Sequence, residues 1–467
     1  MKVKKNKEQK NFIWRKAVIV LFWLLVWQLA AFCIGNTILL EGPVAVFKRF
    51  LADLQTSDYY KTVGASVLRI MGGLFCGILF AVFLGILSWK KRLVEEMLAP
   101  LVQFLKAAPI ACFVVLLLIW AGSKNLAFYI ALLVAFPPIY FNLLEGLKQL
   151  DNSLLEVARV YHMPWKNRMR YIYLPEIKPY FISALSLAVG TAFKAGVAAE
   201  IIGTPDYSMG ERIYMSKIYL DTAGVLSWMI SVIFVAYLCE KICVRLATLY
   251  FDKRPRISTN SKNNKRYLVE NIQSKSLKLT DCTISFDKEI ILDHISLEFE
   301  AGKIYGITGK SGAGKTTFFN TLWGLKKPKD GNISGREEIK AGVFQENRLF
   351  EEYTAIENVF ATGQCSLTVK AVEEAFLELL PKESLSKPVK EYSGGMKRRV
   401  EIMRAMLSDS AILLLDEPFN GLDGETKEKT IEFIKKYQKG RTILFTTHCN
   451  EDIENVKAEE KKLWKKE

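Results

Sequence analysis

Long apolar runs fill the first half of this 467-residue chain and largely disappear after about residue 250. A helix needs about 20 mostly apolar residues to cross the hydrocarbon core of a bilayer. Six runs are long enough, and we expect them to form membrane-spanning helices at 17–34, 65–89, 98–121, 127–147, 180–203 and 225–249. Residues 1–252 are therefore predicted to form an all-α polytopic membrane domain in a lipid bilayer.

Lys and Arg residues are unevenly distributed between these runs. With the N-terminus inside the cell, the inner segments 1–16, 89–97 and 148–178 contain 16 of them, and the outer segments 35–64, 122–125 and 204–224 contain 6. Cytoplasmic loops of membrane proteins are enriched in Lys and Arg. We therefore expect a multi-pass protein of the plasma membrane with its second half in the cytoplasm. We attribute the net charge of +15 to Lys and Arg residues that flank the apolar segments. A nucleic-acid partner is therefore not expected.

The remainder of the chain has a different pattern. Residues 253–276 are polar and basic, which is typical of a linker. From 277 to 467, short apolar runs at 304–308, 411–415 and 442–446 alternate with helical segments. This alternation predicts an α/β domain with a mainly parallel sheet.

A glycine-rich loop follows the predicted strand at 304–308. It consists of Gly309, Lys310, Ser311, Gly312, Ala313, Gly314, Lys315 and Thr316, with Thr317 next to it. The first eight residues fit the phosphate-binding pattern G-x-x-x-x-G-K-[ST], in which backbone N–H groups and a helix N-terminus surround phosphate oxygens. We expect the loop to bind ATP, with Lys315 at the β- and γ-phosphates and Thr316 as a ligand of Mg²⁺.

Two acidic residues, Asp416 and Glu417, follow a second apolar strand about 100 residues later. At the end of a buried strand, Asp416 can hold Mg²⁺ through water, and Glu417 can polarise the water that attacks the γ-phosphate. The spacing from the glycine-rich loop makes this pair a strong prediction for a P-loop ATPase.

The sequence between these two motifs resembles the ATP-binding cassette (ABC) family. Ser393, Gly394 and Gly395 lie in the sequence Tyr-Ser-Gly-Gly-Met, which is similar to the family signature Leu-Ser-Gly-Gly-Gln. By the same resemblance, Gln345 is expected to be the Q-loop glutamine and a further magnesium ligand. Leu422-Asp423 is expected to be the D-loop, and His448 is expected to be the switch histidine. Phe286 is expected to be the aromatic residue that stacks on adenine.

The resemblance also implies a partner. In this family two ATPase domains close head to tail, and each ATP is held between the Lys315 loop of one and the Ser393–Gly395 segment of the other. A second copy of the chain is therefore expected.

The segment between the fourth and fifth predicted spans resembles the importer motif E-A-A-x₃-G-x₉-I-x-L-P. Its positions are occupied by Glu156, Ala158, His162, Leu174 and Pro175; Val157 replaces an alanine, and His162 stands where glycine is usual. In importers this coupling loop forms a short cytoplasmic helix that docks on the ATPase near the Q-loop, here 345–349. The motif therefore favours import and a type I importer-like permease.

Shorter matches at 66–69, 198–203 and 209–210 are similar to permeases of the nitrate/sulfonate/taurine type. This similarity implies a small anionic solute delivered by a separate extracytoplasmic solute-binding protein. Lys194 and Glu200 fall in a predicted span, where charged residues commonly face a cavity or a partner. We expect both on the substrate path, Lys194 first. The alternatives are an ion pair between Lys194 and an acid that holds helices together, or snorkelling of the Lys194 side chain.

The favoured interpretation is an ATP-driven importer subunit with permease and ATPase in one chain. An exporter or lipid flippase is the first alternative, and the loop at 156–175 argues against it. The second alternative is a mechanical transmitter that uses ATP without moving solute. Such a protein would be expected to have large outer loops, whereas the longest outer segment, 35–64, has only about 30 residues.

Overall fold

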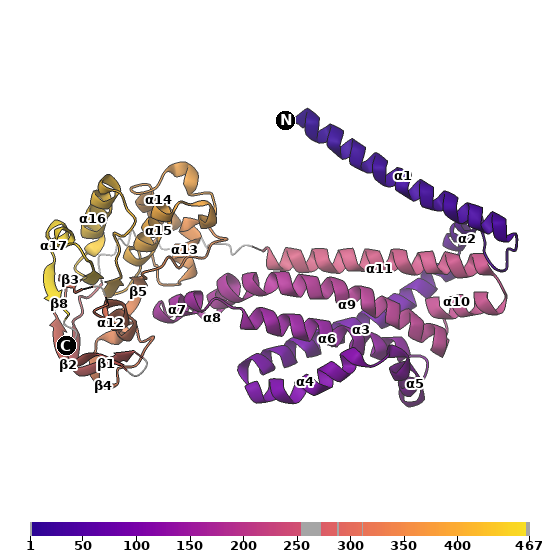
Figure 1. The fold of residues 1–467 in the computed structure, drawn as a ribbon, viewed down its shortest axis with the longest axis horizontal. Helices are drawn as coiled ribbons and strands as arrows, with labels where there is room; N and C mark the ends of the chain where they lie inside the picture. The colour runs from indigo at the N-terminus through magenta and orange to yellow at the C-terminus, as the bar shows by residue number, and fades with distance from the viewer. Residues whose placement is uncertain (1, 254–271, 287–288, 311, 464–467) are drawn as a thin grey trace. The chain divides into compact units, whose positions relative to one another are not determined.

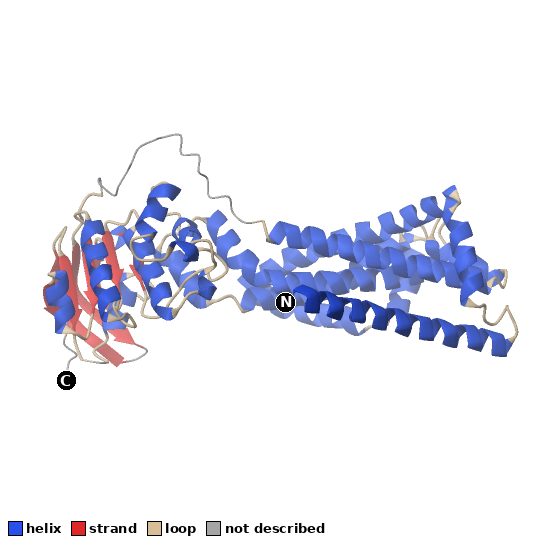
Figure 2. Cartoon of the chain, turned by 90° about the horizontal axis from the view of Figure 1, so that it is seen from above, coloured by secondary structure: helices blue, strands red, loops and turns tan. Residues whose placement is uncertain are grey.

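The computed structural model describes residues 2–253, 272–286, 289–310 and 312–463, with side chains from Trp14 onward and without that of Phe286. The chain divides into two compact units. The helical unit comprises Met1–Gln149 and Glu176–Lys253, and the ATPase unit comprises Leu150–Pro175 and Arg254–Glu467. All strands of the described chain belong to the ATPase unit (Figure 2). Most of the expected linker, 254–271, lies outside the described residues.

Helices account for the secondary structure described in the helical unit (Figure 1). They are α1 (Lys2–Ile34), α2 (Pro43–Leu54), α3 (Ser57–Lys90), α4 (Arg92–Ala107), α5 (Ile110–Ala121), α6 (Leu126–Lys148), α9 (Leu174–Gly203), α10 (Met209–Ile218) and α11 (Thr222–Phe251). Within the described residues, five helices are long and apolar enough to cross a membrane, and the bent pair α4 and α5 could make a sixth. The predicted all-α polytopic domain is confirmed.

The third expected span, 98–121, is not one straight helix. It is broken between α4 and α5, which meet at an angle of 101°. The cause is Pro109, which has no N–H to donate and forces the preceding residue out of helical geometry. Ala108 accordingly has extended backbone angles, with φ −71° and ψ 138°.

Two glycines allow α3 and α6 to pack at short range. A Cβ atom on Gly73 would lie 2.0 Å from the carbonyl oxygen of Phe128, and one on Gly77 would lie 2.8 Å from that of Leu132. Small residues permit such close approach of helix backbones in membrane proteins. This contact forms the centre of the helical unit.

The ATPase unit contains two sheets. The antiparallel sheet has the order β2 (Glu289–Phe299), β1 (Leu277–Phe286), β4 (Asp330–Ser334). The parallel sheet has the order β5 (Ile339–Val343), β6 (Ile412–Leu415), β7 (Thr442–Thr446), β3 (Ile304–Thr308), β8 (Glu459–Lys462). The predicted α/β domain with a mainly parallel sheet is confirmed.

Helices follow the strands of this unit. They are α12 (Lys315–Leu322), α13 (Ala355–Ala361), α14 (Val369–Phe376), α15 (Gly394–Met406), α16 (Gly424–Gln438) and α17 (Asn450–Val456), with α7 (Asn152–Val160) and α8 (Trp165–Arg168) from the loop between α6 and α9. Neighbouring parallel strands end at the same edge of a sheet. The segments after β3, β5, β6 and β7 therefore meet there, and these segments carry the expected site residues.

Candidate functional site

The glycine-rich loop joins β3 to α12. Its described residues are Gly309, Lys310, Gly312, Ala313, Gly314, Lys315, Thr316 and Thr317, and Ser311 lies outside the described residues. Gly312 and Gly314 have φ values of +78° and +87°. A Cβ atom on Gly314 would lie 2.1 Å from Cγ2 of Ile291. Glycine is thus required at position 314 both by backbone conformation and by space.

Lys315 starts α12 and turns back into the loop. Its Nζ donates to the carbonyl oxygens of Gly309, at 2.8 Å, and Lys310, at 3.4 Å. Burial lowers the pKa of Lys315, while the carboxylates of Glu417 and Asp416 oppose this effect. The ammonium group therefore lies inside the loop and near the two acids, where it could meet a phosphate.

Asp416 directly follows β6 and is almost completely buried. Its Oδ1 accepts from the Thr446 hydroxyl at 2.6 Å, and its Oδ2 has no hydrogen-bond partner among the described residues. Burial raises the pKa of Asp416, and the hydrogen bond from Thr446 opposes that rise. A buried polar atom without a partner suggests that a group outside the chain completes the site.

Thr316 and Gln345 lie together near these acids. The Thr316 hydroxyl donates to Oε1 of Gln345 at 3.2 Å. Hydroxyl, amide and carboxylate oxygens, with water and phosphate, are the ligands that Mg²⁺ prefers. Among the described residues, no group of three His, Cys, Asp or Glu side chains could hold a metal. Thr316, Gln345 and Asp416 supply oxygen ligands of these kinds, so they could hold a magnesium ion together with water and phosphate.

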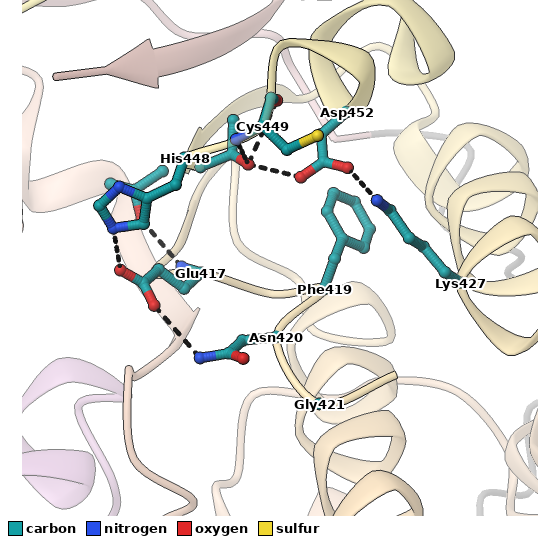
Figure 3. Close-up of a pocket in the computed structure, with 10 residues that line it drawn as sticks. Glu417, Phe419, Asn420, Gly421, Lys427, His448, Cys449 and Asp452 are labelled. Atoms are coloured by element: carbon teal, nitrogen blue, oxygen red, sulfur yellow. Dashed lines mark hydrogen bonds and ion pairs between the residues drawn. The ribbon is translucent and has the colours of Figure 1, made fainter. Parts of the chain in front are cut away.

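Glu417 is held at both its backbone and its side chain (Figure 3). Its φ of +47° is unusual for a residue other than glycine, and its N–H donates to the Thr446 hydroxyl at 2.8 Å. Oε1 lies 2.9 Å from Nε2 of His448, and Oε2 accepts from Asn420 at 3.4 Å. These groups line a pocket of about 300 Å³. A carboxylate so placed can accept a proton from water.

Thr446 was missed by the sequence analysis, although its hydroxyl connects Asp416 and Glu417. The register of the parallel sheet pairs Leu415 with Phe445, so Thr446 lies beside Asp416. Aligning the last residues of the two apolar runs could have identified it. The sequence analysis also did not assign a role to Arg398. Its contacts lie between elements that are distant in the sequence, so no local sequence pattern marks it.

The Ser-Gly-Gly segment begins α15. The Ser393 side chain caps the helix by accepting from the N–H of Met396 at 3.3 Å, and Gly394 has no atom within 4 Å of a Cβ position. Tyr392, which replaces the usual leucine, is buried and donates to the carbonyl of Ser384 at 2.6 Å. In the described part of the chain, no hydrogen bond connects this segment with the Lys315 loop. Its exposed backbone is free to face another molecule.

The structure describes the side chain of the expected D-loop residue Asp423 but not that of the expected adenine contact Phe286. Asp423 caps α16, accepting from the N–H and hydroxyl of Thr426 at 3.0 Å each. Phe286 is the last residue of β1, and its side chain lies outside the described residues.

The predicted coupling loop packs within the ATPase unit. The apolar face of α7, which consists of Leu154, Val157, Ala158 and Val160, belongs to the same core as the strands of the sheet. The Tyr161 hydroxyl donates to the carbonyl of Gly342 at 2.9 Å, and Glu156 forms an ion pair with Arg348. Because Arg348 follows Gln345 by three residues, the loop lies beside the expected Q-loop.

Further contacts hold the rest of the segment. The Asn167 side chain donates to the carbonyl of Ala361 at 2.9 Å, and the Tyr353 hydroxyl donates to that of Arg170 at 3.0 Å. A π-helical turn then leads to Leu174 and Pro175, which are half-buried at the start of α9. The segment therefore contacts the ATPase unit from α7 to the π-helical turn.

His162 takes over the backbone role that glycine has in the importer motif. Its φ is +45°, in the left-handed region. The N–H of Met163 donates to the carbonyl of Ala158, and the N–H of His162 donates to that of Arg159. These two bonds form the Schellman arrangement that commonly ends a helix at glycine. The substitution therefore leaves the turn intact.

The two charged residues expected on the substrate path have different surroundings. Glu200 is fully buried; Oε2 accepts from the Ser66 hydroxyl at 2.8 Å and the Gly210 N–H at 3.3 Å, and Arg69 lies 3.7 Å from Oε1. Lys194 is exposed on the wall of a pocket of about 300 Å³, and no ion pair to it occurs among the described residues. Glu200 thus connects α3, α9 and α10, whereas Lys194 faces open space.

Two family models match this chain. The model described as "Binding-protein-dependent transport system inner membrane component" matches residues 73–257, and the model described as "ABC transporter" matches residues 292–420. The matches do not overlap. They separate the apolar helices from the domain that carries the glycine-rich loop.

Curated relatives match about two fifths of the chain. It is 32% identical over 203 residues to "Nod factor export ATP-binding protein I" of Bradyrhizobium diazoefficiens, covering 40% of this chain and 66% of that protein. It is 30% identical over 190 residues to "Lantibiotic transport ATP-binding protein SrtF" of Streptococcus pyogenes, covering 38% and 83%. The chain spans 57–66% of the length of the first Nod factor relatives.

A solved structure titled "Structure of ATP binding subunit of ABC transporter" is 27% identical. The match covers 39% of this chain and 83% of that chain, with a TM-score of 0.35.

Proposed function

This chain belongs to the ABC transporter family, and on that premise we propose that it is a subunit of an ATP-driven importer. The segment Leu150–Pro175 carries this proposal. It lies between two permease helices, it keeps the spacing of the importer motif with Val157 and His162 as the two departures, and it packs into the core of the ATPase unit. Movement of the ATPase would therefore be transmitted to α6 and α9.

ATP hydrolysis would use the residues at the edge of the parallel sheet. Residues 309–317 surround the phosphates, with Lys315 at the β- and γ-positions and Phe286 at the adenine ring. Thr316, Gln345 and Asp416 would hold Mg²⁺, which would supply neutralising charge to the phosphates during transfer. Glu417 accepts a proton from the attacking water at its carboxylate, and His448 holds that carboxylate by the bond at Nε2.

The complete ATP site would need a second copy of the chain. Ser393 and Gly394 are exposed and Gly395 is half-buried, and no hydrogen bond connects them to the Lys315 loop within the described residues. They would contact the nucleotide bound by the partner copy. We therefore infer a homodimer with two shared ATP sites.

Import is favoured over export by the permease half. The model matching residues 73–257 is one for binding-protein-dependent systems, and such systems receive solute from a separate extracytoplasmic protein. Export is the second candidate, because both curated relatives described above are named for export or lantibiotic transport. Those relatives are ATP-binding proteins and cover at most 40% of this chain. Their names therefore describe proteins similar to the ATPase domain of this chain rather than to its permease domain.

A small anion is the proposed cargo, for example a sulfonate such as taurine, or nitrate. Lys194 supports this assignment because it is the one charged residue that lines a mostly apolar pocket formed by described residues of α5 and α9. Unpaired cations inside membrane proteins commonly mark an ion path. Glu200 is better explained as a structural residue, since its carboxylate is occupied by Ser66 and Gly210.

The distribution of Lys and Arg supports the proposal of a plasma-membrane protein whose ATPase unit lies in the cytoplasm. Reconstitution into vesicles tests the proposal as a whole. ATP is enclosed in the lumen, and labelled taurine or nitrate is added outside with a solute-binding protein that binds the labelled solute. We expect accumulation that requires both ATP and the binding protein. ATP hydrolysis without movement of any tested solute would argue against transport.

A further inference from the structure

Arg398 lies in the second turn of α15, and its side chain is only 3% exposed. Nη2 donates to the backbone carbonyls of Asp416 and Glu417, at 2.6 Å each. Nη1 donates to the carbonyl of Phe344 at 2.5 Å, directly before Gln345. One guanidinium group thus binds the backbone beside the expected magnesium ligands and at the expected catalytic carboxylate.

A buried guanidinium group requires a nearby anion, and Glu401 supplies it. Oε2 of Glu401 lies 3.1 Å from Nη1 of Arg398, and Arg404 lies 3.5 Å from Oε1. Burial raises the pKa of Glu401, while the guanidinium groups of Arg404 and Arg398 oppose that rise. Removal of one partner would leave an uncompensated buried charge.

The backbone of Glu417 depends on these contacts. A φ of +47° is strained for a residue with a side chain and persists only where surrounding contacts hold it. Thr446 binds the N–H of Glu417, and Arg398 binds its carbonyl. Loss of either contact would allow the backbone to relax and the carboxylate to move away from His448.

Glu401 also leads toward the coupling loop. Its Oε1 accepts from the backbone N–H of Arg348 at 2.5 Å. The Arg348 side chain pairs with Glu156 and lies over the ring of Phe344, at 4.2 Å from the ring centre. Along these contacts of the described residues, the coupling loop is therefore connected to Arg398 through Arg348 and Glu401 alone.

We propose that Arg398 and Glu401 are positioning residues for ATP hydrolysis, which hold the Glu417 carboxylate in place and connect it through Arg348 to the coupling loop. This inference rests on the proposed function, because it takes Glu417 as the group that activates water. The two side chains bind backbone and one another rather than the expected phosphate loop. Their loss should reduce kcat and leave the KM for ATP nearly unchanged.

The full chain in lipid nanodiscs tests the positioning role with Arg398→Lys. Lysine keeps the charge but cannot reproduce the fork of donors that reaches several carbonyls. We expect kcat to fall about 10- to 100-fold, since small displacements of reacting groups have effects of this size, with KM for ATP within about twofold.

Arg441→Lys is the matched control. Arg441 is also fully buried and donates to the carbonyls of Met406 and Ser408, away from the site. It should lower the temperature of unfolding and leave kcat per folded molecule unchanged. The inference is overturned if Arg398→Lys keeps the kcat of the unsubstituted chain, or loses activity only in proportion to folded protein. Absence of ATPase activity from the unsubstituted chain would instead overturn the proposed function.

The link to the coupling loop is tested by combining Glu156→Gln with Glu401→Gln. If the two residues act along one path, the combined loss of kcat should be at least about threefold smaller than the product of the single losses. Losses that multiply would show that the coupling loop acts independently of Glu401, and this part of the inference would be wrong.

Discussion

The Glu417 carboxylate is fixed by His448 on one oxygen and Asn420 on the other. We predict that Glu417→Gln reduces kcat for ATP hydrolysis by at least about 100-fold, because an amide cannot accept the proton from water. ATP binding should remain, since the phosphate loop is unchanged. Steady-state hydrolysis and equilibrium ATP binding by the purified full chain measure the two effects separately.

Glu425→Gln is the control for this substitution. Glu425 is an exposed residue in the first turn of α16, eight positions later, and pairs with Lys429 on the same helix. It should hydrolyse ATP like the unsubstituted chain. Normal hydrolysis by Glu417→Gln would show that another group activates the water.

Lys194 provides a test of the cargo. If its ammonium attracts an anion, Lys194→Met should raise the KM for anion uptake by about tenfold or more, with folding and basal ATP hydrolysis unchanged. Lys217→Met, at an exposed lysine of α10, is the matched control and should leave uptake unaffected. Equal uptake by both variants would exclude Lys194 from the substrate path.

Residue chemistry explains which site residues can be predicted from sequence. Lys315, Asp416 and Glu417 lie in short motifs, because phosphate and magnesium demand those residue types next to one another. Thr446 and Arg398 act through contacts between separate elements. Thr446 could be found only by aligning the ends of two apolar strands, and nothing beside Arg398 in the chain marks it. His162 was an apparent departure from the motif, and only its φ of +45° showed that it adopts the conformation expected of glycine.

Among the elements, α7 and the turn after it pack into the core of the ATPase unit. The Tyr161 side chain is fully buried, and burial raises the pKa of its hydroxyl, which therefore remains a hydrogen-bond donor to Gly342. Tyr161→Phe would leave a buried carbonyl without its donor, at a cost of about 1–3 kcal/mol. We predict faster hydrogen exchange in 150–175 and weaker stimulation of ATP hydrolysis by the binding protein.

Tyr219→Phe serves as the control, because Tyr219 is 78% exposed. Unchanged exchange and unchanged stimulation in Tyr161→Phe would mean that this hydrogen bond contributes little to docking.

Docking of the same loop should depend on pH. Burial lowers the pKa of His162, and the positive charges of Lys340 and Arg168 lower it further. A histidine in a free loop has a pKa of about 6.5. Because the docked value is lower, the neutral ring is favoured in the docked loop. Docking should therefore be fully stable above about pH 6.5 and weaken as the pH falls below it.

Hydrogen exchange of 150–175 between pH 5 and 8, corrected for intrinsic rates, measures this effect. His162→Asn, which tolerates the left-handed conformation, should remove the acid-dependent part. His294→Gln is the control, because Asp281 raises the pKa of His294 and its ring lies on the antiparallel sheet. Identical pH dependence in the unsubstituted chain and in His162→Asn would contradict the assignment to His162.

Element boundaries were predictable where one physical requirement dominates. The length of apolar runs identified α3, α6, α9 and α11, because a bilayer sets a minimum length for a spanning helix. The run at 98–121 met the same criterion but is broken at Pro109, since hydropathy does not report the loss of a backbone donor. The apolar strands β3, β6 and β7 were visible for a similar reason, because each is buried in the parallel sheet.

At the scale of the whole molecule, the chain joins a permease to its own motor. The coupling segment belongs to the permease by sequence and to the ATPase unit by its contacts.

The direction of transport is the central claim, and oriented vesicles test it most directly. ATP added outside energises only molecules whose ATPase units face outward, and these expose their extracytoplasmic side to the lumen. The lumen is loaded with labelled taurine or nitrate and the binding protein, and Glu417→Gln serves as the inactive control. We predict ATP-dependent loss of label from the lumen. ATP-dependent accumulation of externally added label in the lumen would instead identify an exporter and contradict this account.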